Sequence, residues 1–101
     1  MNERIKLLSE SAHHSTADEL AHLQRVHNRT YDLYEAAEIY NEKFAELIVR
    51  ECMGMATELE AQYFNNRKEQ TDPKMKKIYT EGEAACDILR FKMKQHFGVE
   101  E

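Results

Sequence analysis

Residues 31–64 read YDLYEAAEIYNEKFAELIVRECMGMATELEAQYF, and they decide the fold of this chain. Apolar side chains recur in this stretch every three or four residues, which places them along one side of an α-helix. The spacing begins near 3.5 residues and lengthens slightly after Phe44, so the apolar stripe should turn slowly around the helix. As one helix the stretch would span roughly 50 Å, longer than a compact domain of this size is wide. The stretch therefore predicts an elongated hairpin or an oligomer.

The sequence on either side predicts a longer helix, over about residues 16–68. Ser15 and Thr16 are each followed three residues later by an acidic residue, a doubled capping-box pattern that favours a helix start. The polar residues 65–72 end the helix. Residues 27–30 read HNRT and are mediocre helix formers, so a kink near residues 28–30 is compatible with the sequence. No Gly or Pro demands one there, and we expect a continuous, distorted helix.

Two further helices are expected. Residues 2–12 carry apolar side chains at helical spacing and predict a short N-terminal helix. Asp72 and Pro73 together are typical of a helix start, and Gly98 is typical of a left-handed C-terminal cap, so a last helix is expected over residues 73–97. The predicted fold is all-α and single-domain: a long helical hairpin with one long helix, one shorter antiparallel helix and a short N-terminal helix.

The apolar pattern also predicts which residues form the hairpin core. Gly54 and Gly82 are expected to allow close approach of the two helices. The predicted core consists of Phe44, Ile48, Cys52, Leu59, Ile78, Leu89 and Met93.

The last helix is too short to cover the whole long helix. The apolar residues left over in the N-terminal half are Leu20, Leu23, Val26, Leu33 and Tyr40. Exposed stripes of this length are rare on monomers, so we expect a homo-oligomer that associates through this half.

Composition narrows the functional classes. The chain has 101 residues and a formal charge of −5, which opposes binding to nucleic acid or to membrane surfaces because both need net positive potential. No apolar run reaches the length of a membrane span, and no secretion signal is evident at the start, so we expect a cytoplasmic protein. Cys52 and Cys86 lie on apolar helix faces, where a thiol behaves as a small hydrophobe.

No catalytic signature stands out, and we expect a protein that is not an enzyme and needs no cofactor. Glu19 and His22 form an E-x-x-H pair, the half-motif of helical di-iron sites, but no second pair is present. His13, His14, His22 and His27 cluster without the i, i+4 spacing of a helical metal clamp. We therefore expect no metal site, with polar surface favoured over a metal-binding or pH-responsive patch.

Two groups of residues are candidate binding sites. Guanidinium groups beside tyrosine rings can hold a phosphate and stack a base, which makes Arg25, Arg29, Tyr31 and Tyr34 the candidate nucleotide-binding residues, although packing of the tyrosines is the favoured interpretation. The second group surrounds the turn between the last two helices. It would bind phosphate or an acidic protein surface, although a solvated turn is the simpler interpretation. Its members are Arg67, Lys68, Lys74, Lys76 and Lys77.

Three blocks of sequence carry a resemblance. MNERIK at residues 1–6, EKFAELIVREC at 42–52 and KQHFGVE at 94–100 resemble a diffuse group of small accessory proteins of tailed bacteriophages. The resemblance implies a phage origin and expression in the cytoplasm of a bacterial host, and it assigns no functional residue. By analogy with such proteins, we expect a non-enzymatic protein that binds and blocks a host factor, for example a component of host defence. The alternatives are an oligomeric sponge for a cyclic-nucleotide defence signal, and a structural or scaffold protein of the virion.

Overall fold

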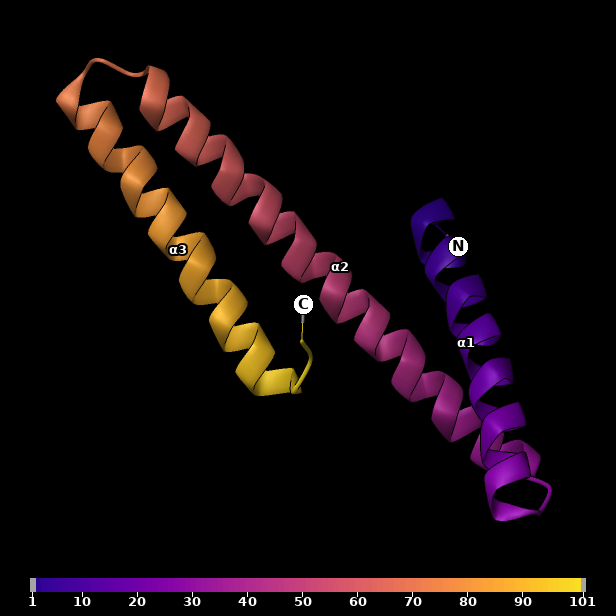
Figure 1. The fold of residues 1–101 in the computed structure, drawn as a ribbon. Coiled ribbons are helices and arrows are strands. Elements are labelled where there is room, and N and C mark those ends of the chain that lie inside the picture. Colours follow the sequence, from indigo (N-terminus) through magenta and orange to yellow (C-terminus); the bar gives the residue numbers. More distant parts are fainter. Residues whose placement is uncertain (1, 101) are drawn as a thin grey trace. The chain divides into compact units, whose positions relative to one another are not determined.

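The computed structural model describes residues 2–100 and contains three α-helices, with no strand among those residues. Helix α1 spans Glu3–His27, α2 spans Leu33–Glu69 and α3 spans Pro73–Phe97 (Figure 1). The predicted all-α class is confirmed. The chain divides into two compact units, residues 1–48 and residues 49–101, and α2 contributes to both. Within residues 2–100, no helix combines the length and hydrophobicity needed to cross a membrane.

The N-terminal helix is 25 residues long, so the prediction of a short helix over residues 2–12 was wrong. Asn2 caps it, because its side chain accepts hydrogen bonds from the backbone N–H groups of Arg4 and Ile5. Ser15 and Thr16 lie inside the helix instead of starting one. The Thr16 hydroxyl is buried and donates to the carbonyl oxygen of Ala12 at 2.7 Å. A hydroxyl that bonds back to the preceding turn is satisfied within a helix, so it marks no boundary.

The predicted continuous helix over residues 16–68 is instead broken at residues 28–32. Asn28 ends α1 in the left-handed conformation, with φ 50° and ψ 44°, which Asn adopts more readily than most residues. Asp32 then starts α2: its Oδ1 accepts from the backbone N–H of Glu35 at 2.8 Å, and Glu35 Oε1 accepts from the backbone N–H of Asp32 at 3.4 Å. This reciprocal capping box stabilises a new helix start, which explains the full break.

In the first unit, α1 packs on the first part of α2 (Figure 1). The Tyr40 hydroxyl is 2.7 Å from the Ser9 hydroxyl, and the Tyr40 ring stacks on His13 with centroids 4.3 Å apart. Glu19 pairs with Lys43 at 3.0 Å. Because α1 covers part of the stripe that we expected to drive oligomerisation, that argument no longer supports association through this half. Self-association itself stays a prediction.

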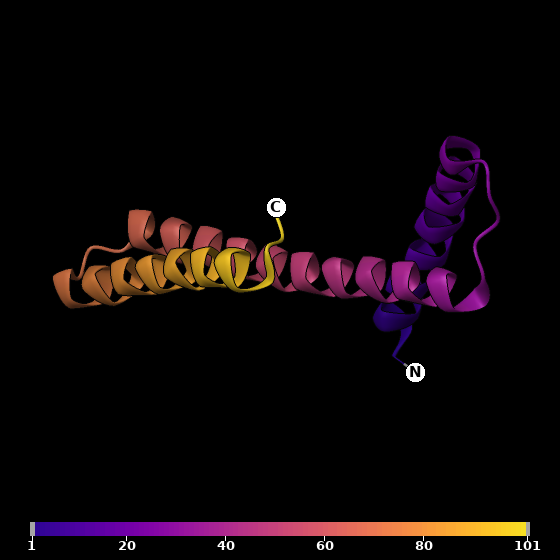
Figure 2. The same ribbon diagram turned by 90° about the horizontal axis from the view of Figure 1, so that it is seen from below.

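In the second unit, α3 runs antiparallel beside the second part of α2, as both views show (Figure 2). The predicted start of α3 is confirmed: Pro73 is its first residue, and the Asp72 side chain accepts from the backbone N–H of Lys74. Gly98 is the left-handed C-terminal cap, as predicted. Residue Val99 beyond the cap is buried, so it also packs within this unit.

The predicted hairpin core was largely wrong. Leu59, Ile78 and Leu89 are 43%, 53% and 52% exposed; Ile48 and Cys52 are also exposed, whereas Phe44 and Met93 are half-buried. The buried apolar residues of the second unit are Met53, Ala56, Cys86 and Val99. In α3 the predicted Cys86 and Met93 are buried and half-buried. In α2 the buried or half-buried residues Val49, Met53 and Glu60 each follow the predicted Ile48, Cys52 and Leu59 by one residue, which turns the covered side by about 100° around the helix.

Only one of the two glycines allows a close approach between the helices. A Cβ atom on Gly82 would lie 2.8 Å from the Tyr63 ring, so the absence of a side chain lets the ring pack on α3. A Cβ atom on Gly54 would have no neighbour within 4 Å, so the prediction for that glycine was wrong.

The buried position of Met53 provides a test of the packing. Met53 is 1% exposed, so Met53→Ala should lower the free energy of unfolding by about 2 to 5 kcal/mol, the range for emptying a packed site. Leu33→Ala is the control, because Leu33 is 87% exposed and its truncation should change stability by less than about 0.5 kcal/mol. Denaturant unfolding followed by circular dichroism measures both. Equal effects of the two substitutions would contradict this packing.

Candidate functional site

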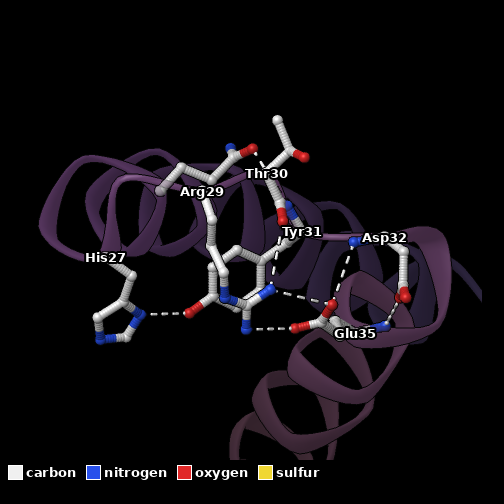
Figure 3. A network of polar contacts seen from close by, with 7 residues as sticks. His27, Arg29, Thr30, Tyr31, Asp32 and Glu35 are labelled. Atoms are coloured by element: carbon white, nitrogen blue, oxygen red, sulfur yellow. Dashed lines mark hydrogen bonds and ion pairs between the residues drawn. The ribbon is translucent and has the colours of Figure 1, made fainter.

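The segment that joins α1 to α2 holds a network of polar contacts (Figure 3). The Arg29 guanidinium lies over the Tyr31 ring, with Cζ 4.0 Å from the ring centroid. The Tyr31 hydroxyl is 2.6 Å from Nδ1 of His27. The two terminal nitrogens of Arg29 donate to the two carboxylate oxygens of Glu35, at 2.8 Å and 3.3 Å. Arg29 is therefore held from two sides, by an aromatic face and by a bidentate ion pair.

Glu35 connects this network to the helix start. Its Oε1 accepts from the Asp32 backbone N–H as well as from Arg29. The hydrogen bond from Arg29 lowers the pKa of Glu35 below its ordinary value, against a smaller opposing effect of desolvation. The same hydrogen bond raises the pKa of Arg29. A single carboxylate thus caps α2 and neutralises the arginine of the loop.

The structure brings together two of the four residues predicted to bind a nucleotide. Arg29 and Tyr31 are in contact. Tyr34 is 73% exposed. Among residues 2–100, neither Arg25 nor Tyr34 makes a side-chain hydrogen bond, ion pair or ring contact. The carboxylate of Glu35 already occupies the guanidinium that would hold a phosphate. The arrangement is therefore suited first to fixing the loop.

Sequence reasoning missed Glu35 and His27 as members of this network. A signal for Glu35 was present, since Asp32 and Glu35 have the spacing of a capping box. No signal in the sequence indicated that the imidazole of His27 would meet the Tyr31 hydroxyl.

The second candidate site lies at the turn between α2 and α3. Arg67 is not available there, because its guanidinium pairs with Glu83 at 2.7 Å and its Cζ lies 5.0 Å from the Phe64 ring centroid. That hydrogen bond with Glu83 raises the pKa of Arg67. Lys68 is exposed, with its ammonium 5.2 Å from the centroid of the same ring. Arg67 thus helps hold α3 to α2.

The remaining cations of this turn are unpaired. All four are exposed, and within residues 2–100 none of them forms an ion pair. We call this set the basic turn; it consists of Lys68, Lys74, Lys76 and Lys77. The structure therefore keeps four of the five residues predicted for this site available to a partner.

The residues considered for a metal site have other contacts. Across residues 2–100, no group of three or more His, Cys, Asp or Glu side chains is placed to hold a metal ion. Glu19 pairs with Lys43, and this hydrogen bond raises the pKa of Lys43. His13 stacks on Tyr40, and His27 contacts Tyr31. These side chains stabilise helix contacts and the loop.

The two cysteines differ in environment. Both are free thiols; Cys86 is buried between the helices of the second unit, as predicted, whereas Cys52 is exposed. The burial predicted for Cys52 was wrong for the single chain.

Comparison with known proteins identified no relative: no family model, no curated protein and no solved structure matches this chain.

Acid should release the pair between Arg29 and Glu35. Because the pKa of Glu35 is lowered in the folded chain, the pair contributes stability above pH 4.5 and loses it as the pH falls below 4.5 through the folded pKa. An NMR titration should find the midpoint of Glu35 below 4.5. In Arg29→Gln the midpoint should rise towards the ordinary value, since the main cause of the shift is gone. An unchanged midpoint in that variant would refute the assigned ion pair.

Proposed function

We propose that this chain works by binding without turnover, and that its basic turn docks on an acidic surface of another protein and blocks it. The observation that carries the proposal is the presence of four exposed lysines without ion pairs at one turn of a chain whose net charge is −5. The same turn holds two acidic residues, Glu69 and Asp72, so its four lysines leave it with a net charge of +2, four minus two. A local excess of positive charge favours a partner of opposite sign.

The kind of partner follows from the charge distribution. A long polyanion such as DNA would meet the net negative charge of the rest of the chain, which opposes its binding. A protein with a local acidic patch meets only the basic turn. Complementary patches of this kind accelerate association and select among partners, with an effect that weakens as salt rises. We therefore favour an acidic protein surface over nucleic acid.

The origin of the partner is part of the proposal. The three sequence blocks that resemble phage accessory proteins support a phage origin and a target in the cytoplasm of a bacterial host. Two of these blocks contact each other in the second unit, where Arg50 Nε donates to the carbonyl oxygen of Glu100 at 3.0 Å. This contact links the second and third blocks within the second unit.

A nucleotide sponge is the second candidate function. The observation in its favour is the guanidinium of Arg29 stacked on Tyr31, with Arg25 exposed near the end of α1 and Tyr34 exposed at the start of α2. The carboxylate of Glu35 opposes it, because an incoming phosphate would have to replace that carboxylate at Arg29. For this reason we place the sponge behind the protein blocker.

Reversing the charge of the basic turn should abolish partner capture. In a pull-down from a bacterial lysate, Lys76→Glu combined with Lys77→Glu should lose the protein that the wild type retains, and added salt should weaken the wild-type interaction. The control combines Lys6→Glu with Arg25→Glu, which alters net charge equally but lies on α1. The control should retain the partner. Equal loss in both variants would show that net charge, and not the basic turn, determines binding.

The sponge predicts a different result. Calorimetry with cyclic and linear nucleotides should show binding that Arg29→Ala weakens by about 1.5 to 3 kcal/mol, the contribution of a hydrogen bond to a charged group. Glu35→Gln should strengthen the same binding, because it frees the guanidinium. No heat of binding with the wild type would eliminate the sponge and leave the blocker.

A further inference from the structure

The second unit has an apolar groove along one flank, with a volume of about 540 Å³. Both helices of the unit line it, and Glu58 and Gln62 are its polar lining residues. We call it the apolar groove; its apolar lining consists of Cys52, Met55, Ala56, Leu59, Cys86 and Leu89.

The groove holds large side chains that water reaches. Met55, Leu59 and Leu89 are 64%, 43% and 52% exposed. The ion pairs that join the helices are Arg67 with Glu83 at 2.7 Å and Arg90 with Glu60 at 2.6 Å. None of these four charged residues lines the groove. The unit therefore has one flank fixed by charge and another that is apolar and open.

The second unit buries few apolar residues. Its buried apolar residues are Met53, Ala56, Cys86 and Val99, two of them small. Units of this size rarely obtain enough stability from a single core and commonly add oligomerisation. The residues that would enlarge this core are the exposed ones in the groove. The molecule that covers these residues must be present whenever the chain folds. This favours a second copy of the chain over a different protein that binds after folding.

The charges beside the groove are complementary between copies. Glu58 lines the groove from α2. Lys92 lies three residues after Leu89 on α3, and so on the same face of that helix. Both are exposed, and within residues 2–100 neither forms an ion pair. When α2 of one copy lies against α3 of another, opposite charges meet at both edges.

We propose that the apolar groove is the dimer interface of this protein, occupied by the same groove of a second copy. Two hairpins placed face to face form a four-helix bundle, in which Met55, Leu59 and Leu89 of both copies become the shared core. This interface goes beyond the proposed function, because the basic turn lies outside the groove and stays available to its partner.

Sedimentation of the full chain at tens of micromolar tests the proposal. The wild type should be a dimer, and Leu89→Glu should be a monomer because it places a charge in the shared core. Phe91→Glu is the control: Phe91 is on the same helix and 59% exposed, but it lines a separate hollow with Asp87 and Arg90. This variant should remain a dimer. A monomeric wild type, or a dimer of Leu89→Glu, would overturn the proposal.

Thiol labelling tests the same interface without a disruptive substitution. Cys52 is exposed in the single chain but would be covered in the dimer, so it should react with maleimide at least about tenfold more slowly than a cysteine introduced by Phe91→Cys. Both cysteines are measured in the dimeric fraction, and the buried Cys86 should stay unreactive. Comparable rates for Cys52 and the introduced cysteine would place the interface elsewhere and overturn the proposal.

Discussion

The packing of two helices along a single line of contact is the constraint on which the second unit depends. A pair of helices can bury only one narrow stripe of each partner, and α2 and α3 use residues such as Met53, Ala56 and Cys86 for it. Gly82 lets the ring of Tyr63 lie close to α3 on the same line. The larger apolar side chains beside that line are left uncovered. The dimer that we propose follows from this shortage of cover.

Several arginines join helices and loops in this chain. Arg29, Arg67 and Arg90 are each paired with a carboxylate, at 2.8 Å, 2.7 Å and 2.6 Å. The planar guanidinium binds a carboxylate through two parallel hydrogen bonds, which suits it to this role. Lysines pair as well, Lys43 with Glu19 at 3.0 Å and Lys94 with Glu100 at 2.8 Å. The lysines of the basic turn make no such pairs among the described residues, so their availability follows from their place at the turn and not from their residue type.

Local signals in the sequence predicted the second unit better than the first. The start of α3 at Pro73 and its cap at Gly98 were predictable because each depends on the chemistry of neighbouring residues. The loop at residues 28–32 was missed because two capping patterns competed. The Ser15 and Thr16 pattern predicts a helix start, but the Thr16 hydroxyl is satisfied inside α1. The capping box that forms is the one of Asp32 with Glu35.

The hairpin core and the candidate site show where sequence patterns stop being sufficient. Periodicity identifies the apolar side of a helix but not the part of that side that faces its neighbour, which explains why Leu59 and Leu89 were placed in the core of a single chain. The spacing in the sequence also correctly predicted that Arg29 and Tyr31 lie close together. It gave no indication that Glu35 would neutralise the arginine, because that contact depends on where α1 ends and α2 begins.

The dimer that we propose couples folding of the second unit to association with a second copy. Thermal unfolding of the full chain at a series of protein concentrations tests this coupling. If the folded state is stabilised by association, Tm should rise steadily with concentration, because mass action favours the bound form. A single unfolding transition whose Tm is the same at every concentration would show that the second unit folds without a second copy.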